Sequence, residues 1–396
     1  MRLYESEAKA LLKKHQVPIP PGGVAKTAAE AEKIAGELGG AVVVKALVLF
    51  GARDRIEAAN AADAKAAAEK LLAADQSGKK PFGVLIEKRT AAKARYSLRI
   101  TYDGSVKLPV MLASAVTGKD IDDVADEQPG AVKRRYFSAL LPPSSYRAKE
   151  LVTELGVPGA VLPRMTGVVD RLNQVLLDYD LNIVDVPSLA VTEDGKVVVE
   201  DVFMDMEIEA RARQKPNLDA LGVDPADARV PREPTAFDKA GAKIDKDDPR
   251  GVAGPIVEFD GNIGCVIGAG GGSLTTFDAI RGHGGRPANY AAIGGNPSVK
   301  KCQELTKLVL SKPGVEKIVV ISNVVSNTRA DLLARGVIKG VIELGKKPSD
   351  VIAIFRSPGA WESDAAKILK KYGVEYCDRS VSISEAARRG VEKIGK

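Results

Sequence analysis

The second half of the chain alternates short runs rich in valine and isoleucine with longer amphipathic stretches. The short runs are typical of buried strands, and the stretches between them have the apolar spacing of surface helices. Their alternation predicts a doubly wound parallel sheet, in which ligands bind at the carboxyl ends of the strands. The predicted strands are 317–322, 351–357 and 375–378, and the predicted helices are 299–311, 329–344, 362–373 and 384–394.

The first half mixes helices and strands with two hairpins. Thr27 is predicted to cap a helix, with Glu30 three positions later. Asp-Gly pairs at 103–104 and 194–195 favour tight turns between antiparallel strands. The predicted helices are 5–14, 27–40, 61–72 and 166–177, the predicted strands are 41–46 and 84–87, and the predicted hairpins join 95–102 to 107–114 and 181–192 to 196–204.

A polar, proline-rich stretch, residues 211–254, separates the two patterns. This composition predicts a connection between domains. We therefore expect an α/β protein with a first domain over 1–210, a linker over 211–254 and a second domain over 255–396, each domain large enough for a core of its own.

The composition is that of a globular protein, with 45% hydrophobic and 28% charged residues. No apolar run approaches the roughly 18 residues of a membrane span, and the N-terminus predicts an amphipathic helix instead of a signal peptide. Three scattered cysteines without metal-ligand spacing favour a reducing, cytoplasmic location. The net charge of +6 is dispersed among acidic residues, which favours small anionic ligands over nucleic acid.

Three glycine loops follow one another in the second half: Gly268–Gly272, His283–Gly285 and Gly294–Ser298. The first follows an apolar run and precedes a segment that is compatible with a helix from about Leu274. Such a loop directs free backbone N–H groups at an anion, and glycine lets the ligand oxygens approach closely. A tight turn between strand and helix explains one such loop equally well, but three together favour an anionic ligand.

Charged residues on the predicted strands are candidates for binding phosphate and metal. Lys45 stands among valines, where a lysine either reaches water at a sheet edge or holds a phosphate. The second hairpin carries Asp185 and Asp201 on neighbouring strands, with Glu200 beside them. Such a pair suits a Mg²⁺ ion that bridges nucleotide phosphates, and the alternative is a solvated strand end.

Polar residues at the ends of the second-half strands are candidates for binding an acid. Asn327 and Thr328 are predicted to open a helix and to offer amide, hydroxyl and backbone donors. Arg356 ends a strand, and its planar guanidinium can form paired hydrogen bonds with a carboxylate. The alternative for Arg356 is a surface ion pair.

The chain resembles the β subunit of succinyl-CoA synthetase over nearly its whole length. The second half carries DGNIGC, GAGGGS and HGGRPANY, which are close to that family's signature. In the first half, LYESEAKALLKKHQVPIPPG, the VVVK strand, the LIEK segment and the strand pair with Asp185 and Asp201 also match. The details GGGS, GGNPS and SNT are similar to the corresponding part of ATP-citrate lyase and citryl-CoA synthetase.

The resemblance implies an ATP-grasp domain followed by a flavodoxin-like CoA-ligase domain. It implies a ligase that forms acyl-CoA from an acid, CoA and ATP or GTP through an acyl phosphate, with Mg²⁺ as cofactor. It also implies a hetero-oligomer, in which a partner α subunit supplies the CoA site and the phosphorylated histidine. His283 matches an HGG loop that is not the phosphorylated site, so the missing histidine also argues for a second chain.

The same resemblance assigns nucleotide-binding roles to positions in the first half. Lys45 matches the lysine that holds the nucleotide phosphates, and Arg53 matches a basic residue of the nucleotide loop. The positions that match the hinge whose backbone meets the adenine are Ile86, Glu87 and Lys88.

Further positions match the metal, catalytic and acid-binding residues of the family. Asp201 matches a Mg²⁺ ligand, and Asp185 stands where the family has the catalytic glutamate that steadies the phosphohistidine. The positions that match residues holding the acid substrate are Gly271, Gly272, Gly295, Asn327, Thr328 and Arg356.

Three departures from the family pattern fall in the nucleotide half. Pro187 replaces a Mg²⁺-ligating asparagine, and Ala94 stands where a glutamate contacts the nucleotide. The nucleotide loop reads GARDR, with Asp54 where a glycine is usual. A loop that loses glycine and gains an acid holds phosphate less well.

The sequence therefore supports an active acid–CoA ligase subunit and leaves two alternatives open. One is a diverged paralogue that serves as a carboxylate- or acyl-CoA-binding or regulatory subunit, which accounts for the departures. The other is a subunit of citryl-CoA synthetase or ATP-citrate lyase, since GGNPS and SNT favour an acid larger and more polar than succinate. An NAD-binding protein is excluded, because no acidic residue follows the glycine run at the distance that ribose binding needs.

Overall fold

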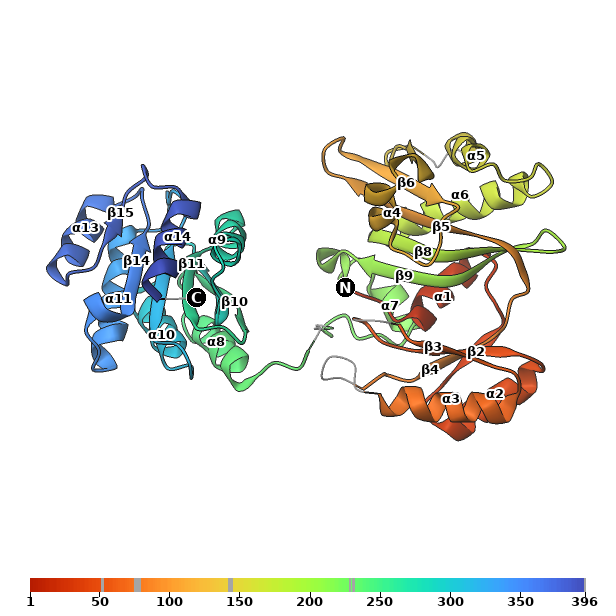
Figure 1. The fold of residues 1–396 in the computed structure, drawn as a ribbon, viewed down its shortest axis with the longest axis horizontal. Coiled ribbons are helices and arrows are strands. Elements are labelled where there is room, and N and C mark those ends of the chain that lie inside the picture. The colour runs from red at the N-terminus through yellow and green to blue at the C-terminus, as the bar shows by residue number, and fades with distance from the viewer. Residues whose placement is uncertain (51–52, 75–79, 142–144, 228, 230–231, 395–396) are drawn as a thin grey trace. The chain divides into compact units, whose positions relative to one another are not determined.

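The computed structural model describes all residues except 51–52, 75–79, 142–144, 228, 230–231 and 395–396. The chain divides into two compact units, Met1–Glu233 and Pro234–Lys396 (Figure 1). The stretch 211–254, predicted as a linker, contributes elements to both. Helix α7 (Lys215–Ala220) belongs to the first unit, whereas α8 (Ala236–Asp247) and the beginning of β10 (Val252–Glu258) belong to the second.

The first unit contains two antiparallel sheets, one with the strand order β1-β4-β2-β3 and one with the order β7-β6-β5-β8-β9. Helices α2 and α3 cover one face of the four-stranded sheet and pack their alanines against its valines (Figure 1). The Thr27 hydroxyl accepts from the Glu30 N–H, as predicted for the helix cap. The elements of this part are β1 (Gly22–Ala25), α2 (Ala28–Leu38), β2 (Val42–Ala46), β3 (Arg55–Ala58), α3 (Ala61–Ala73) and β4 (Val84–Lys88).

The five-stranded sheet confirms both predicted hairpins, which are β5–β6 and β8–β9. Helices α1, α5 and α6 share one apolar core with this sheet. Helix α6 begins four residues before the predicted start, with Pro163 in its first turn. The elements are α1 (Glu5–Lys14), β5 (Ala92–Asp103), β6 (Leu108–Ser114), α4 (Ile121–Glu127), β7 (Val132–Tyr136), α5 (Ser145–Glu154), α6 (Leu162–Asp178), β8 (Leu181–Thr192) and β9 (Val197–Met206).

The second unit is a six-stranded sheet with the order β10-β12-β11-β13-β14-β15. Apart from the antiparallel edge strand β10, all neighbouring strands are parallel. Counted from β11, the order is 2-1-3-4-5, which is the flavodoxin-like winding that we expected. The strands after β10 are β11 (Ile263–Gly268), β12 (Asn289–Gly294), β13 (Lys317–Ile321), β14 (Ile352–Arg356) and β15 (Tyr376–Cys377).

Helices cover both faces of this sheet, as a doubly wound fold requires. One apolar core contains residues of α8, α10, α11 and α13, and a second contains residues of α9 and α14. The helix bounds are α9 (Gly271–Gly282), α10 (Val299–Leu310), α11 (Ala330–Glu343), α12 (Pro348–Val351), α13 (Glu362–Lys371) and α14 (Ile383–Ile394).

The three glycine loops, which together favoured an anionic ligand, do not lie at the same edge of the sheet. Gly268–Gly272 and Gly294–Ser298 follow β11 and β12 at the carboxyl edge of the sheet. His283–Gly285 follows α9 and precedes β12, so it lies at the opposite edge. His283 there contacts the Ser384 hydroxyl at 3.0 Å.

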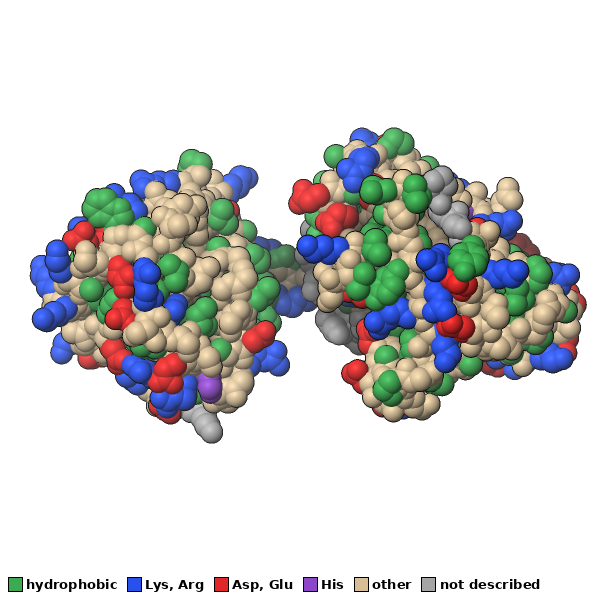
Figure 2. All heavy atoms as spheres, turned by 90° about the horizontal axis from the view of Figure 1, so that it is seen from above, with side chains coloured by type: hydrophobic (Ala, Val, Ile, Leu, Met, Phe, Trp, Pro, Cys, Tyr) green, Lys and Arg blue, Asp and Glu red, His purple; other side chains and the backbone are tan. Residues whose placement is uncertain are grey.

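The face of each unit seen in Figure 2 is mixed in charge. Figure 2 shows Lys and Arg side chains interspersed with Asp and Glu over the displayed face of each unit. Within the part of the chain that the structure describes, no helix is both long enough and apolar enough to cross a bilayer.

Candidate functional site

Lys45 is the centre of a buried charge cluster in the first unit. It lies on β2, an interior strand, and only 5% of its surface is exposed, so the alternative of a lysine at a sheet edge is wrong. Its Nζ lies 2.9 Å from Glu5, 2.9 Å from Glu87 and 2.5 Å from Asp201. Burial by itself would lower the pKa of Lys45, but the three carboxylates together raise it. Lys45 is therefore a buried side chain that stays positively charged.

A second buried lysine, Lys9 of α1, joins the same cluster. Its Nζ lies 2.5 Å from Glu87 and 2.9 Å from Glu5, and the Glu200 carbonyl accepts from both Lys9 and Lys45 at 2.6 Å. Sequence reasoning missed Glu5 and Lys9. The available signal was their position on the apolar face of the helix, because residues four apart share a face.

Asp201 and Glu200 connect this cluster to two arginines. The second Asp201 oxygen lies 2.9 Å from Arg55, and Glu200 accepts from Arg95 at 2.7 and 3.1 Å. The Asp201 side chain is 18% exposed, so the alternative of a solvated strand end is wrong. Burial raises the pKa of Asp201, but Lys45 and Arg55 lower it below its ordinary value.

Asp185 belongs to a different network, which corrects the prediction of a carboxylate pair across the hairpin. It is opposite Phe203 on β9, and a register irregularity separates it from Ser188, the partner of Asp201. Asp185 instead binds Arg99 of β5 at 3.0 Å. Burial raises the pKa of Asp185 by more than Arg99 lowers it.

Arg99 is shared among several carboxylates. Besides Asp185, it binds Asp120 at 2.8 Å and Asp122 at 2.7 Å, both at the beginning of α4. The pKa of Arg99 is raised, because these partners outweigh burial. A fixed cation therefore lies between Asp185 and the start of α4.

The predicted adenine hinge lies on β4. Ile86 is in the apolar core, Glu87 is in the charge cluster, and both pair with β1 and β2 through the backbone. The chain leaves the sheet after Lys88, whose N–H donates to the Pro21 carbonyl at 2.9 Å. Ladder pairing thus occupies the backbone of Ile86 and Glu87 in this conformation.

A small pocket of about 30 Å³ joins these groups, a volume on the scale of single water molecules. Arg55 and Arg95 lie in its wall and fill the space beside Lys45 and Glu87. Arg53 lies in the loop before β3 and donates to the carbonyl of Val202 on β9 at 3.0 Å. Of the predicted nucleotide loop GARDR, residues 51 and 52 lie outside the described residues.

The glycines predicted to hold the acid lie at the carboxyl edge of the second sheet. Helix α9 begins at Gly271, earlier than the predicted start near Leu274, so Gly271 and Gly272 form its first turn. Gly270 before them has φ 78°, and Gly295 after β12 has φ 65°, conformations that favour glycine. The Ser273 N–H donates to the Gly270 carbonyl at 3.0 Å, whereas the N–H groups of Gly271 and Gly272, at the start of the helix, can face an anion.

Arg356, at the end of β14, is a buried cation at the same edge. It is 5% exposed and donates to the Val381 carbonyl at 2.6 Å and to the Ser322 carbonyl. Among the described residues it forms no ion pair, so the alternative of a surface ion pair is wrong. Burial lowers its pKa. A buried guanidinium without a carboxylate is suited to an anionic ligand.

Asn327 and Thr328 lie in the loop before α11 and not in the helix, which begins at Ala330. Thr328 is buried and accepts from the Asn296 N–H at 3.2 Å, whereas Asn327 is exposed. This contact joins the loop after β13 to the loop after β12.

Backbone hydrogen bonds also join the loops after β13 and β14. The Val325 N–H donates to the Pro358 carbonyl at 2.8 Å, and the Ala360 N–H donates to the Val325 carbonyl at 2.9 Å. Trp361 follows with φ 60°, and Arg329 stacks over its ring at 3.8 Å. Sequence reasoning missed this pair, although Trp361 is the only tryptophan.

Comparison with known proteins agrees with this arrangement. The model of the ATP-grasp domain family matches residues 2–191. The ADP-forming succinate–CoA ligase β subunit of Pyrobaculum calidifontis is 31% identical, and that of Methanothermobacter thermautotrophicus is 30% identical, each over 99% of both chains.

A solved structure shares the fold over the whole chain. It is the ATP citrate lyase from Methanothrix soehngenii in complex with citrate and coenzyme A, with a TM-score of 0.64 and 17% identity over 99% of both chains. The likeness confirms the expected fold class, an ATP-grasp domain followed by a flavodoxin-like CoA-ligase domain. With these relatives and this fold, the chain belongs to the family of succinate–CoA ligase β subunits.

Proposed function

We propose that this chain is the β-type subunit of a nucleotide-dependent carboxylic acid–CoA ligase. The reaction joins an acid and CoA with ATP or GTP, and yields acyl-CoA, the nucleoside diphosphate and phosphate. It passes through an acyl phosphate and a phosphohistidine that a partner α subunit carries. The observation that carries this proposal is the buried Lys45–Asp201 pair, set in a chain of this ligase family.

The first unit binds the nucleotide in this proposal. Lys45 and Arg53 contact its phosphates. The base meets the hinge Ile86–Lys88 at its end, Lys88, where the chain leaves the sheet. Arg55 and Arg95 leave the pocket of about 30 Å³ when the nucleotide enters. Phosphate oxygens then replace Asp201 and Glu200 as partners of these cations, because phosphate accepts the same charge-assisted hydrogen bonds.

Asp201 is the protein ligand for Mg²⁺ in this proposal. The Pro187 side chain has no atom that could ligate a metal ion. The described residues contain no group of three His, Cys, Asp or Glu side chains that could hold a metal. One carboxylate is still a sufficient protein contribution, since Mg²⁺ at nucleotide sites takes its other ligands from phosphates and water. Bound there, the ion would neutralise phosphate charge.

Asp185 steadies the partner's phosphohistidine in this proposal. An aspartate that accepts an imidazole N–H must be ionised and fixed in direction. Arg99 fixes the direction of the carboxylate, since it binds Asp185 through two nitrogens at 3.0 and 3.2 Å, and it opposes the burial that raises the pKa of Asp185. Arg99 is therefore a positioning residue in this scheme.

The second unit binds the acid. Arg356 receives one carboxylate, and the first turn of α9 and the loop at Gly295 supply backbone N–H groups. Thr328 and Asn327 offer further polar contacts on the adjoining loop. Several donors of different kinds suit a hydroxylated di- or tricarboxylate better than a simple fatty acid.

The test is reconstitution with the α-type subunit, followed by measurement of ADP release over a panel of di- and tricarboxylates with CoA. We expect one acid to support turnover. Arg356→Ala should raise the KM for this acid by about tenfold or more, because the variant loses roughly one charge-assisted contact. The control is Arg335→Ala, an exposed arginine on α11. An unchanged KM in Arg356→Ala rejects the acid-binding role.

A second candidate is a binding or regulatory subunit that no longer turns over nucleotide. The small pocket and the Pro187 substitution favour it. It predicts no acid-dependent ADP release and no nucleotide-induced thermal shift. Turnover with citrate alone in the acid panel would instead identify a citryl-CoA synthetase or ATP-citrate lyase subunit.

We also infer a cytoplasmic location. All three cysteines are buried and free, and burial raises the pKa of Cys265 and of Cys302 to about 12. Thiols of this kind pack as small apolar groups and support a reducing compartment.

A further inference from the structure

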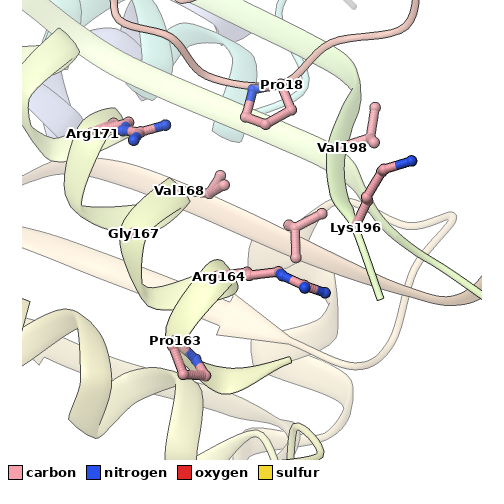
Figure 3. A pocket seen from close by; sticks show the side chains of 9 residues that line it. Pro18, Pro163, Arg164, Gly167, Val168, Arg171, Lys196 and Val198 are labelled. Atoms are coloured by element: carbon pink, nitrogen blue, oxygen red, sulfur yellow. The ribbon is translucent and has the colours of Figure 1, made fainter. Parts of the chain in front are cut away.

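A hollow of about 350 Å³ lies on the first unit (Figure 3). It shares no lining residue with the pocket beside Lys45. Figure 3 shows α6 on one side and the first residues of β9 on the other, with Pro18 between them. Val168 and Val197 are buried and form an apolar floor, which Pro18 and Pro163 extend. The hollow is about ten times larger than the pocket beside Lys45.

The charged residues that line the hollow are all cations: Arg164, Arg171 and Lys196. Arg164 donates to the Gly195 carbonyl at 2.9 Å, and Arg171 donates to the Gln16 carbonyl at 2.6 Å. Neither arginine forms an ion pair with a carboxylate among the described residues. A guanidinium carries five N–H donors, so these backbone contacts fix its position and leave donors for a ligand.

The two arginines stand at opposite ends of the hollow. Arg164, Gly167, Val168 and Arg171 have the spacing i, i+3, i+4 and i+7, which places them on one face of α6. Seven residues of helix separate the arginines by about 10.5 Å along the axis. The face thus presents a cation, an apolar stretch and a second cation.

Gly167, between the arginines, keeps the hollow open. Glycine weakens the interior of a helix, so its presence calls for a reason. A Cβ at Gly167 would meet no atom within 4 Å, and its φ is not in the left-handed region. Neither crowding nor backbone conformation therefore requires glycine here. Its effect is to leave empty the space that a side chain would fill.

We propose that this hollow binds an elongated organic dianion, a long-chain α,ω-dicarboxylate. The two carboxylates pair with Arg164 and Arg171, and the methylene chain lies over Gly167 and Val168. Length is the basis of selectivity, since only a long acid reaches both guanidinium groups. The site is distinct from the nucleotide and acid sites proposed above and does not depend on them.

The test is calorimetric titration of the full-length chain with succinate, adipate, suberate and sebacate, and with octanoate as a monoacid of similar length. We expect affinity to rise with chain length and octanoate to bind about tenfold or more weakly than suberate, because it lacks one charge-assisted contact. Arg164→Gln and Arg171→Gln should each weaken the binding of suberate by a similar factor.

Gly167→Leu should abolish binding, because its side chain fills the hollow. The matched control is Gly36→Leu on α2, another helical glycine whose Cβ would meet no atom within 4 Å. Circular dichroism checks that both variants fold. Equal affinities for all the acids, or unchanged suberate binding in Gly167→Leu, would overturn the proposal. If Arg356→Ala lost suberate binding while Gly167→Leu retained it, the acid would bind in the second unit. That result would also overturn the proposal.

Discussion

Lys45 contributes to the stability of the first unit as well as to its proposed function. Lys45 contacts three carboxylates below the surface, so removing it leaves buried negative charge without compensation. Loss of activity in Lys45→Ala would for this reason not identify a phosphate contact by itself. The role of Lys45 must be tested with its carboxylate partners varied as well.

Lys45→Met should lower the free energy of unfolding by about 3–5 kcal/mol, the usual result of breaking a buried ion pair from one side. Adding Glu5→Gln should restore part of this loss, since one of the uncompensated charges is then removed. Urea denaturation followed by circular dichroism measures both variants. Lys33→Met is the control, because Lys33 and Glu37 form an exposed pair worth about 1 kcal/mol or less. Equal losses in the single and double variants would contradict the prediction.

Asp201 should contribute a pH-dependent part of the stability. Its pKa in the folded chain lies below its ordinary value of 3.8, so its contribution is present above that value and is lost as the pH falls through the folded pKa. The difference in thermal midpoint between wild type and Asp201→Asn should therefore be largest near neutral pH and shrink below about pH 4. If the difference in thermal midpoint grew on acidification, the pKa of Asp201 would be raised in the folded chain, contrary to the prediction.

At the scale of elements, strand register and loop pairing decide which polar groups meet. The irregularity in β8 separates Asp185 from Asp201, although both lie on one hairpin. The loops after β13 and β14 are joined at Val325 and Gly359, which form an isolated bridge. This contact positions Thr328 and Arg356 on two rigidly connected segments.

Gly359→Ala should disturb the acid site more than it disturbs the fold. Gly359 has φ 124°, and a Cβ there would lie 2.0 Å from the Val325 carbonyl oxygen, so the two loops must separate. We expect a higher KM for the acid and a stability loss of about 1–3 kcal/mol. Gly314→Ala is the matched control, because Gly314 has φ 84° but open space at the Cβ position. It should lose stability with an unchanged KM, and similar KM values in both variants would reject the positioning role.

At the scale of the whole molecule, the chain consists of two units with separate apolar cores. Their charged side chains are interspersed on the face shown in Figure 2. The doubly wound unit has cores on both faces of its sheet and contains the only tryptophan, Trp361.

Residues 234–396 should fold as an isolated fragment, because the core of this unit draws on its own helices and strands. We expect a single cooperative urea transition, followed through Trp361 fluorescence. The same transition measured by circular dichroism should coincide with it. A fragment without cooperative unfolding would show that its stability requires the first unit.

Local patterns made most of the elements predictable. Apolar periodicity located β2, β4 and the helices of the doubly wound unit, because a strand or helix that buries one face must repeat its apolar residues at the matching period. Asp-Gly turns located both hairpins. The linker prediction for 211–254 relied on composition, which does not distinguish a surface helix such as α8 from an extended connection.

The sequence by itself determined the alternation of elements, the family signature and the identity of the strand-end residues Asn327, Thr328 and Arg356. Tertiary structure alone decided which charges meet. Glu5 and Lys45 are 40 positions apart in the sequence and touch only because folding brings the first residue of α1 to the Lys45 side chain of β2. The HGG loop lies at the far edge of the sheet only because α9 runs back along it. Periodicity is a local property of the chain, whereas ion pairing depends on strand order and register, which arise when distant segments pack together.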